Sequence, residues 1–113
     1  MKTILNYKGK RFGLDVKKCS GISKFFGLMF KGRNAGNLLF EFDRETSLAI
    51  HSLFCPEFLA IWANNNKFVA FEVVKPWKLG VKPAEKFTKL LEIPVNSRNS
   101  AVITFIVGKS KHL

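Results

Sequence analysis

Several features that mark common protein classes are absent from this sequence. No run of about 18 apolar residues occurs, so a transmembrane helix is not expected, and the N-terminal region lacks the apolar stretch of a secretion signal. Only two cysteines are present, Cys19 and Cys55, and they lie far apart. We expect them to be free thiols of a cytoplasmic protein rather than a disulfide framework. Internal repeats and low-complexity linkers are also missing, so we predict a single domain over residues 1–113.

Acidic residues are scarce. The chain has 8 Asp and Glu against 19 Lys and Arg, which gives a formal net charge of +11. The excess lies in residues 1–34 (+8) and 73–113 (+6), whereas residues 35–72 carry −3. A positive surface attracts nucleic acid, anionic lipid or acidic ligands. The alternative is an ordinary solvated surface in a lysine-rich lineage, because no basic helix and no aromatic stacking motif accompanies the charge.

Apolar residues are plentiful by contrast, at 47% of the chain with twelve Phe, which predicts a folded globular domain. Short apolar or alternating segments separated by turn residues are typical of a mainly β, small barrel- or sandwich-like domain. We predict strands at residues 3–7, 11–16, 38–42, 47–54, 58–62, 67–75, 90–93 and 101–107. One short helix is expected over residues 22–30, where apolar side chains recur at helical spacing. The phenylalanines assigned to the core are Phe12, Phe25, Phe26, Phe30, Phe40, Phe42, Phe54 and Phe71.

Motifs for nucleotide, cofactor or nucleophile chemistry are also missing. The sequence contains no phosphate-binding loop, no dinucleotide-binding fingerprint and no serine-centred nucleophile elbow, so no cofactor is predicted. No two carboxylates are placed together by the pattern. Glu92, between Leu91 and Ile93, is expected to point away from the core and toward a lysine.

His51 and Cys55 lie in a strongly apolar segment, residues 50–62 (IHSLFCPEFLAIW), and form one candidate pair for a metal or a nucleophile. Strand positions four residues apart are separated by about 13 Å, which is too far for one ion, and zinc needs further ligands. Apolar neighbours raise the pKa of a thiol, which disfavours a nucleophilic Cys55. A hydrolase or metal-binding protein that uses His51 and Cys55 is therefore a weaker alternative to the two functions given below.

The order of short motifs along the chain is more specific than any single residue. GLMF (27–30) and GNLLF (36–40) are followed by IHS (50–52), KPW (75–77) and LLEIP (90–94). Over about residues 10–108 this order resembles domain of unknown function family 192, in its archaeal form. The resemblance implies a mainly β domain with one short helix near GLMF, and it implies no activity. The family usually has Arg before GLMF and an Asp after its central Pro. This chain has Phe26 and Phe58 at these two positions, so a polar site built from the family's Arg and Asp is not expected.

We therefore predict a non-enzymatic binding or accessory module without a catalytic residue or a metal site. A ligand site is expected where GLMF, the His51 segment and the Lys75-Pro76-Trp77 turn converge. Its candidate residues are Met29, His51, Cys55 and Trp77, with Arg33 and Lys75 as contacts for an anionic ligand. The alternative is a nucleic-acid-associated basic protein that uses Lys8, Lys10, Arg11, Lys17 and Lys18.

Overall fold

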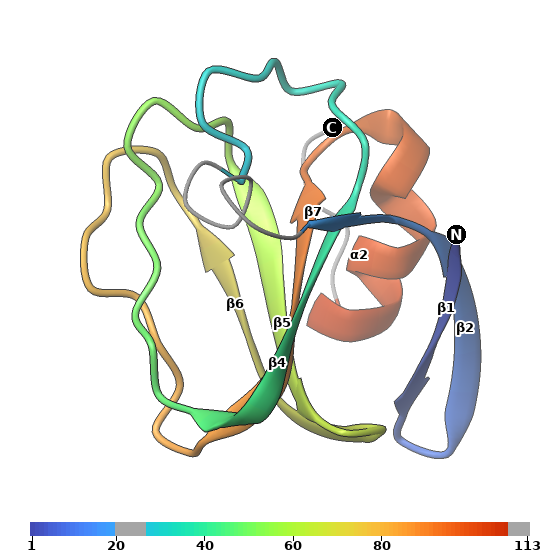
Figure 1. Cartoon of the computed structure of the whole chain (residues 1–113). Coiled ribbons are helices and arrows are strands. Elements are labelled where there is room, and N and C mark those ends of the chain that lie inside the picture. The colour runs from blue at the N-terminus through green and yellow to red at the C-terminus, as the bar shows by residue number, and fades with distance from the viewer. Residues whose placement is uncertain (20–26, 109–113) are drawn as a thin grey trace.

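The computed structural model describes residues 1–19 and 27–108, which form a β-rich domain with two sheets and one short α-helix (Figure 1). The strands and helices are β1 (Lys2–Tyr7), β2 (Lys10–Asp15), β3 (Lys17–Cys19), β4 (Leu38–Thr46), β5 (Phe58–Asn64), β6 (Lys67–Val74), β7 (Phe87–Pro94), the 3-10 helix η1 (Ser97–Asn99) and α2 (Ser100–Val107). The prediction of a mainly β fold with one short helix is confirmed for this part of the chain. No helix in the described ranges is long and apolar enough to cross a membrane.

The larger sheet has the strand order β3-β4-β7-β5-β6, with β7 and β5 at its centre. β3 runs parallel to β4, and the other neighbours are antiparallel. Five consecutive residues at the start of β5 are buried, from Phe58 to Trp62. A strand that is buried on both faces needs such a continuous apolar run instead of an alternating one. The centre of this sheet is therefore covered from two sides.

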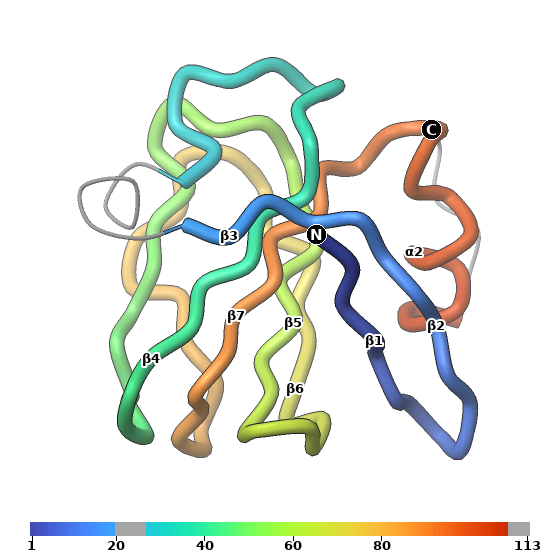
Figure 2. The backbone as a smooth tube through the Cα atoms, turned by 45° about the vertical axis from the view of Figure 1, so that its right-hand side comes forward, coloured from blue at the N-terminus to red at the C-terminus, as the bar shows by residue number. Residues whose placement is uncertain are grey.

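The β1–β2 hairpin and α2 cover one face of the sheet (Figures 1 and 2). Leu91 and Ile93 of β7 point to this face and belong to the same core cluster as Ile103 of α2. The Phe105 ring of α2 packs against both hairpin strands, with its centroid 5.7 Å from that of Tyr7 and 5.4 Å from that of Phe12. The turn at Lys8 and Gly9 closes the hairpin with positive φ angles, as the sequence predicts.

Loops cover the opposite face. A second core cluster lies here, with side chains from β4, β5 and β7 packed under residues 27–37, 47–57 and 75–86. Residues 47–54 are one of these loops, so the prediction of a strand there is wrong. Only Ile50 forms an isolated bridge, with Val81. Other backbone groups of this segment bond outside the sheet, because the N–H of Ser52 donates to the carbonyl of Lys78 and the N–H of Leu53 donates to Nδ1 of His51.

The C-terminal segment corrects a second prediction, because residues 101–107 form a helix and not a strand. The segment is rich in β-branched residues, which favour strands. However, Val102, Ile103 and Ile106 are the buried residues, which is the spacing of one helical face. The side chain of Asn96 caps η1, which leads directly into α2, by accepting a hydrogen bond from the backbone N–H of Asn99, and Gly108 ends α2 with a left-handed φ of 82°.

The helix expected over residues 22–30 can be compared with the structure only in part, because residues 20–26 lie outside the described residues. Its described part, residues 27–30, forms a turn. β4 also continues through residues 43–46, beyond the predicted end of this strand at residue 42. Of the phenylalanines assigned to the core, Phe30, Phe54 and Phe71 are exposed, whereas Phe40 is buried.

The packing of α2 against the sheet can be tested at Ile103. We expect Ile103→Ala to lower the free energy of unfolding by about 2–5 kcal/mol, because the fully buried side chain would leave a cavity between helix and sheet. Thr104→Ala, at the next and exposed position, should change it by no more than about 0.5 kcal/mol. Urea unfolding of both variants measures the difference, and equal effects would contradict the helical register.

Candidate functional site

Three loops meet at the end of the main sheet where β4 and β5 begin, and backbone hydrogen bonds join them. The N–H of Phe30 donates to the carbonyl of Phe54 at 2.8 Å, and the N–H of Trp77 donates to the carbonyl of Ser52 at 3.0 Å. GLMF, the segment around His51 and the Lys75-Pro76-Trp77 turn are therefore tied together. The sequence motifs place the candidate site at this meeting point.

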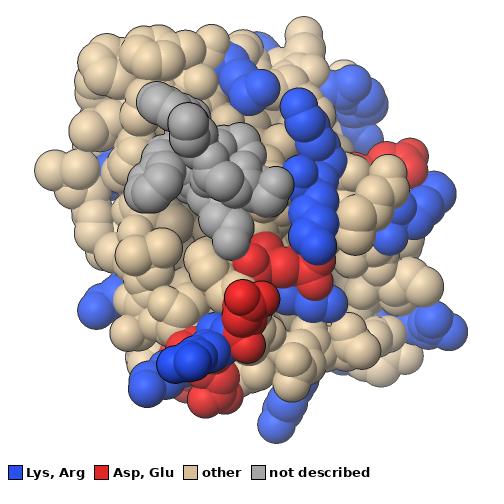
Figure 3. Space-filling view, in the orientation of Figure 1, with Lys and Arg blue, Asp and Glu red and all other residues tan. Residues whose placement is uncertain are grey.

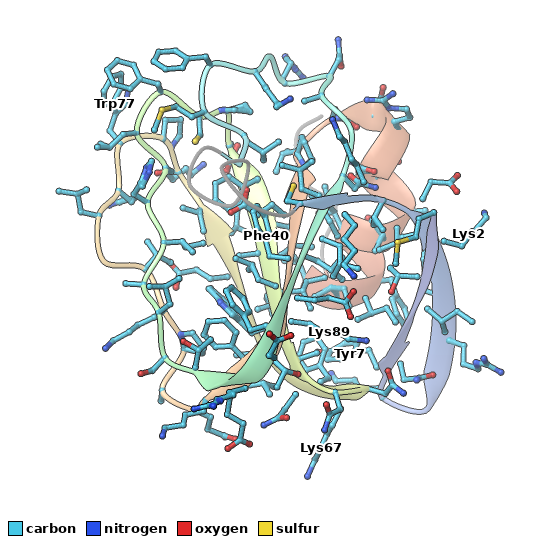
Figure 4. The ribbon with its side chains drawn as sticks, viewed as in Figure 1. Lys2, Tyr7, Phe40, Lys67, Trp77 and Lys89 are labelled. Carbon is cyan, nitrogen blue, oxygen red and sulfur yellow. The ribbon has the colours of Figure 1, made fainter. Side chains whose placement is uncertain are left out.

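Phe30, Phe54 and Trp77 form an exposed group of rings at this end, here called the aromatic cluster. The ring centroids of Phe30 and Phe54 are 4.9 Å apart with the rings stacked, and Trp77 lies edge-on to Phe54 at 4.7 Å. The exposed fractions are 75% for Phe30, 51% for Phe54 and 62% for Trp77, and Leu79 is 72% exposed. Trp77 lies at the outer margin of the molecule in Figure 4. Single exposed apolar residues are common, whereas a contiguous exposed group marks an interaction surface.

The backbone is in the left-handed region at all three residues of the aromatic cluster. The φ angles are 63° at Phe30, 58° at Phe54 and 66° at Trp77. Bulky side chains rarely adopt this conformation, which costs about 1–3 kcal/mol per residue. Each of the three loops thus has a left-handed residue whose ring joins the cluster. Strain of this kind is typical of functional sites.

Ser52 holds two of the loops in this arrangement. It is fully buried, and its hydroxyl donates to the carbonyl of Lys75 at 2.6 Å and accepts from the N–H of Lys78 at 2.8 Å. Its backbone N–H donates to the carbonyl of Lys78, and its own carbonyl accepts from Trp77. One serine therefore fixes the turn that carries Trp77 from both sides.

Met29 and His51, two of the predicted site residues, support this end of the molecule from below its surface. Both are half-buried. Met29 packs against the second core cluster. Nδ1 of His51 accepts a hydrogen bond from the N–H of Leu53 at 3.1 Å, which closes the turn that leads to Phe54. His51 thus shapes the loop that presents an aromatic ring.

Cys55 and Glu92 lie beneath this surface, and both are buried. The Cys55 thiol donates to the carbonyl of Leu53 at 3.4 Å. The pKa of this thiol is raised from 9.0 to about 11. Burial is the larger cause, and the nearby charge of Glu92 is the smaller one. The thiol therefore keeps its proton at neutral pH, which disfavours a nucleophilic role.

Glu92 points into the second core cluster, so the prediction that it faces outward toward a lysine is wrong. Leu91 and Ile93 do face the first cluster, but the opposite face is also covered, and Glu92 is only 5% exposed. Burial raises the pKa of its carboxyl from 4.5 to about 7, and the N–H of Leu28 lowers it by a hydrogen bond. A Cβ at Gly27 would lie 2.9 Å from Oε1 of Glu92, so only glycine lets the GLMF turn pass over this carboxyl.

The predicted anion contacts, Lys75 and Arg33, are both exposed but lie in different surroundings. Nζ of Lys75 is 2.8 Å from Oε2 of Glu57, an ion pair that lacks the angle of a hydrogen bond. The carbonyl of Arg33 accepts from the side chain of Asn96, which ties this part of the loop to the start of η1. Lys75 thus belongs to the Trp77 turn, whereas Arg33 lies where the loop approaches η1.

Two other lysines are direct chain neighbours of the aromatic cluster. Lys31 follows Phe30 and Lys78 follows Trp77, and both are exposed. Three acidic residues belong to or adjoin these loops: Glu57 is paired with Lys75, Glu92 is buried, and Glu85 is exposed but lies at the far end of residues 75–86, beside residues 64–66. The aromatic cluster is therefore apolar with a cationic margin.

The basic residues of the N-terminal part lie elsewhere. Lys8, Lys10 and Arg11 are at the tip of the β1–β2 hairpin, which extends away from the three loops in Figures 1 and 2. Lys8 also lies 5.3 Å above the ring of Tyr7, and Lys18 pairs with Glu41 at 3.2 Å. Lys17 is exposed on β3. On the face drawn in Figure 3 the Lys and Arg side chains are scattered and form no single patch.

No group of three or more His, Cys, Asp or Glu side chains that could hold a metal occurs within residues 1–19 and 27–108. Comparisons with models of known families, with curated proteins and with solved structures found no match to the chain. The site is therefore interpreted from its own geometry.

Sequence reasoning missed three residues at this site. Phe30 and Phe54 were assigned to the core, although both stand within turn sequences, next to Lys31-Gly32 and to Cys55-Pro56. Within the same segment, the sequence pattern favours His51 and not Ser52 as a site residue. The only sequence signal for it is a small polar residue within an apolar run, which is typical of a buried hydroxyl with backbone partners.

Glu92 predicts an unusual dependence of stability on pH. Because its pKa is raised in the folded state, the folded protein binds more protons than the unfolded chain between about pH 4.5 and about pH 7. Stability should be full below this range and fall by roughly 3 kcal/mol as the pH rises through it. In Glu92→Gln this fall should disappear, so that the variant is the more stable protein above pH 7. Parallel curves for the two proteins, measured by urea unfolding, would contradict the assignment.

Ser52 predicts a specific loss of stability in the loops. Ser52→Ala leaves the Lys75 carbonyl and the Lys78 N–H without their partner, and we expect a cost of about 1–3 kcal/mol. Ser47→Ala, in the same loop but exposed, is the matched control and should stay within about 0.5 kcal/mol of the original protein. Both are measured by urea unfolding, and an equal effect of the two substitutions would refute the role of Ser52.

Proposed function

We propose that the protein is a non-enzymatic binding or accessory module of the cytoplasm, and that the aromatic cluster is its contact surface for an anionic partner. The observation that carries this proposal is the exposure of three rings packed in series, with Phe54 in contact with both Phe30 and Trp77, each on a left-handed residue of a different loop. Folding alone would favour burial of these rings and relaxed backbone at their positions. A binding role accounts for both departures.

The chemistry of the neighbouring side chains supports binding over catalysis. The Cys55 thiol is buried and its raised pKa keeps it protonated, and the Nδ1 atom of His51 is engaged with the backbone of its own turn. Lys31 and Lys78 add positive charge at the margin of the cluster. Aromatic and cationic side chains together are typical of binding surfaces.

The resemblance to domain of unknown function family 192 is part of the same proposal. Gly27 of the GLMF motif passes over Glu92 of LLEIP, and IHS and KPW supply the loop that carries Phe54 and the turn that carries Trp77. The motifs behind the resemblance thus lie around one site. We propose that they are kept together for the construction of this surface.

Intrinsic tryptophan fluorescence tests the binding surface, because Trp77 is exposed whereas Trp62 is buried and provides a constant background. Three anionic probes are offered: a single-stranded oligonucleotide, polyglutamate, and vesicles that contain phosphatidylglycerol. We expect at least one of them to change the Trp77 emission, with an affinity that falls about tenfold or more when Phe30 and Phe54 are both replaced by Asn, a residue that tolerates left-handed backbone.

Leu48→Asn is the matched control, since Leu48 is an exposed apolar residue of the same loops that does not belong to the aromatic cluster. It should bind like the original protein. Trp77→Phe should abolish the spectral change and so identify the reporter. The proposal is overturned if none of the three probes alters the emission, or if the double Asn variant binds as tightly as the control.

A further inference from the structure

We infer that the aromatic cluster docks onto a membrane surface that carries anionic lipid headgroups. The inference rests on the proposed function and names the chemistry of the partner. It is carried by the packing of the rings, by their position at the loop ends, and by the charges beside them.

The packing of the rings disfavours a nucleic acid as the partner. A base that inserts between two rings needs about 7 Å between their planes, twice the contact distance of carbon atoms. The centroids in the aromatic cluster are only 4.9 and 4.7 Å apart, and Phe54 is covered by Phe30 and Trp77. The rings therefore form one closed apolar projection without slots for successive bases. The hairpin cations Lys8, Lys10 and Arg11 lie at the other end of the domain (Figure 2), so they do not form one basic surface with this cluster.

The position of the cluster suits a fluid interface better than a shaped protein partner. The rings stand at the ends of three loops on one end of the domain, and Trp77 lies at the outer margin of Figure 4. Leu79, two residues further on, is even more exposed than Trp77. A stable protein–protein interface needs shape complementarity over a large buried area, whereas a lipid headgroup layer can accommodate a small group of exposed apolar side chains. Trp is also a residue that membrane interfaces favour, because one end of its ring is apolar and the other is wet.

The charges beside the cluster match an anionic bilayer. Lys31 and Lys78 are exposed and adjoin Phe30 and Trp77 along the chain, so their ammonium groups can reach the headgroups while the rings enter the layer below. A lysine near an anionic surface strengthens binding about fivefold. Glu57, the acidic residue of this region that is not buried, is held by Lys75, so its repulsion from the lipid is reduced. The interior side of the cell presents such an anionic leaflet to a cytoplasmic protein.

Vesicle binding of the full chain tests the inference. We expect co-sedimentation with vesicles of phosphatidylcholine that contain phosphatidylglycerol, weaker binding to phosphatidylcholine alone, and a decrease as salt is added. The Trp77 emission should shift to shorter wavelength, and lipids brominated in their acyl chains should quench it. This last readout uses the unmodified protein and reports entry of the ring below the headgroups.

Matched variants separate a specific site from net charge. Lys31→Gln with Lys78→Gln should weaken binding to the anionic vesicles about 25-fold at low salt, two steps of about fivefold each. Lys8→Gln with Lys10→Gln removes the same charge at the hairpin tip and should change binding less than threefold, which is below the roughly fivefold effect of one lysine at the surface. Every variant is first checked for cooperative unfolding, and all four lysines are exposed.

The inference is overturned if anionic vesicles do not bind the protein, if brominated lipids leave the Trp77 emission unchanged, or if the two lysine pairs act equally. If the oligonucleotide or polyglutamate binds at the cluster and vesicles do not, the membrane inference fails while the proposed binding surface stands. If the cluster instead joins two copies of the chain, sedimentation will show a dimer that the double Asn variant lacks, and the membrane inference also fails. If no probe binds, both proposals fail.

Discussion

The pairing of β5 with β7 imposes the constraint on which the rest of the molecule depends. These two central strands are buried on both faces, so each face requires a cover. On one side the β1–β2 hairpin and α2 provide regular secondary structure. On the other side the chain supplies only loops, which must be held by individual hydrogen bonds such as those of Ser52. The ordered loop ends that present the aromatic cluster are a by-product of this unequal covering.

The loop-covered side also contains the features that stabilise the fold least. Glu92 places a carboxyl in an apolar cluster, and the indole N–H of Trp62 has no hydrogen-bond partner among the described residues. Burial of such groups costs free energy, as does left-handed backbone at three aromatic residues. Among the described residues, the buried Asn96 and Asn99 near the start of α2 do have partners, because they hydrogen-bond to nearby backbone atoms and to the side chain of Asn37. Buried polar groups without full compensation and strained backbone thus occur on the loop-covered face, which is consistent with function on that side.

The sequence predicted those parts of the fold that local chemistry determines. The hairpin turn at Lys8 and Gly9 and the strands β5 and β6 follow from turn residues and apolar runs. It failed where tertiary context decides. The β-branched residues of α2 favour a strand, but the docking of one helical face against the sheet selects a helix. Glu92 was placed outside because an alternating strand was assumed to have one covered face, whereas β7 has two.

The candidate site shows the same division. The order of the motifs indicated which three segments to consider together, and these segments do meet. It could not reveal that Phe30 and Phe54 are outside, because a phenylalanine in the core and one held outward by a left-handed backbone have the same one-letter code. The family resemblance and the binding role stay predictions, and they rest on the geometry of these loops.

The strand order β3-β4-β7-β5-β6 has a further consequence for synthesis on the ribosome. β7 is the last strand to leave the exit tunnel and must insert between β4 and β5, so until then both strands present open hydrogen-bonding edges. The nascent chain can close its hairpins early. Its central sheet can form only after nearly the whole described chain has been translated, so the final assembly is a late step that joins segments far apart in the sequence.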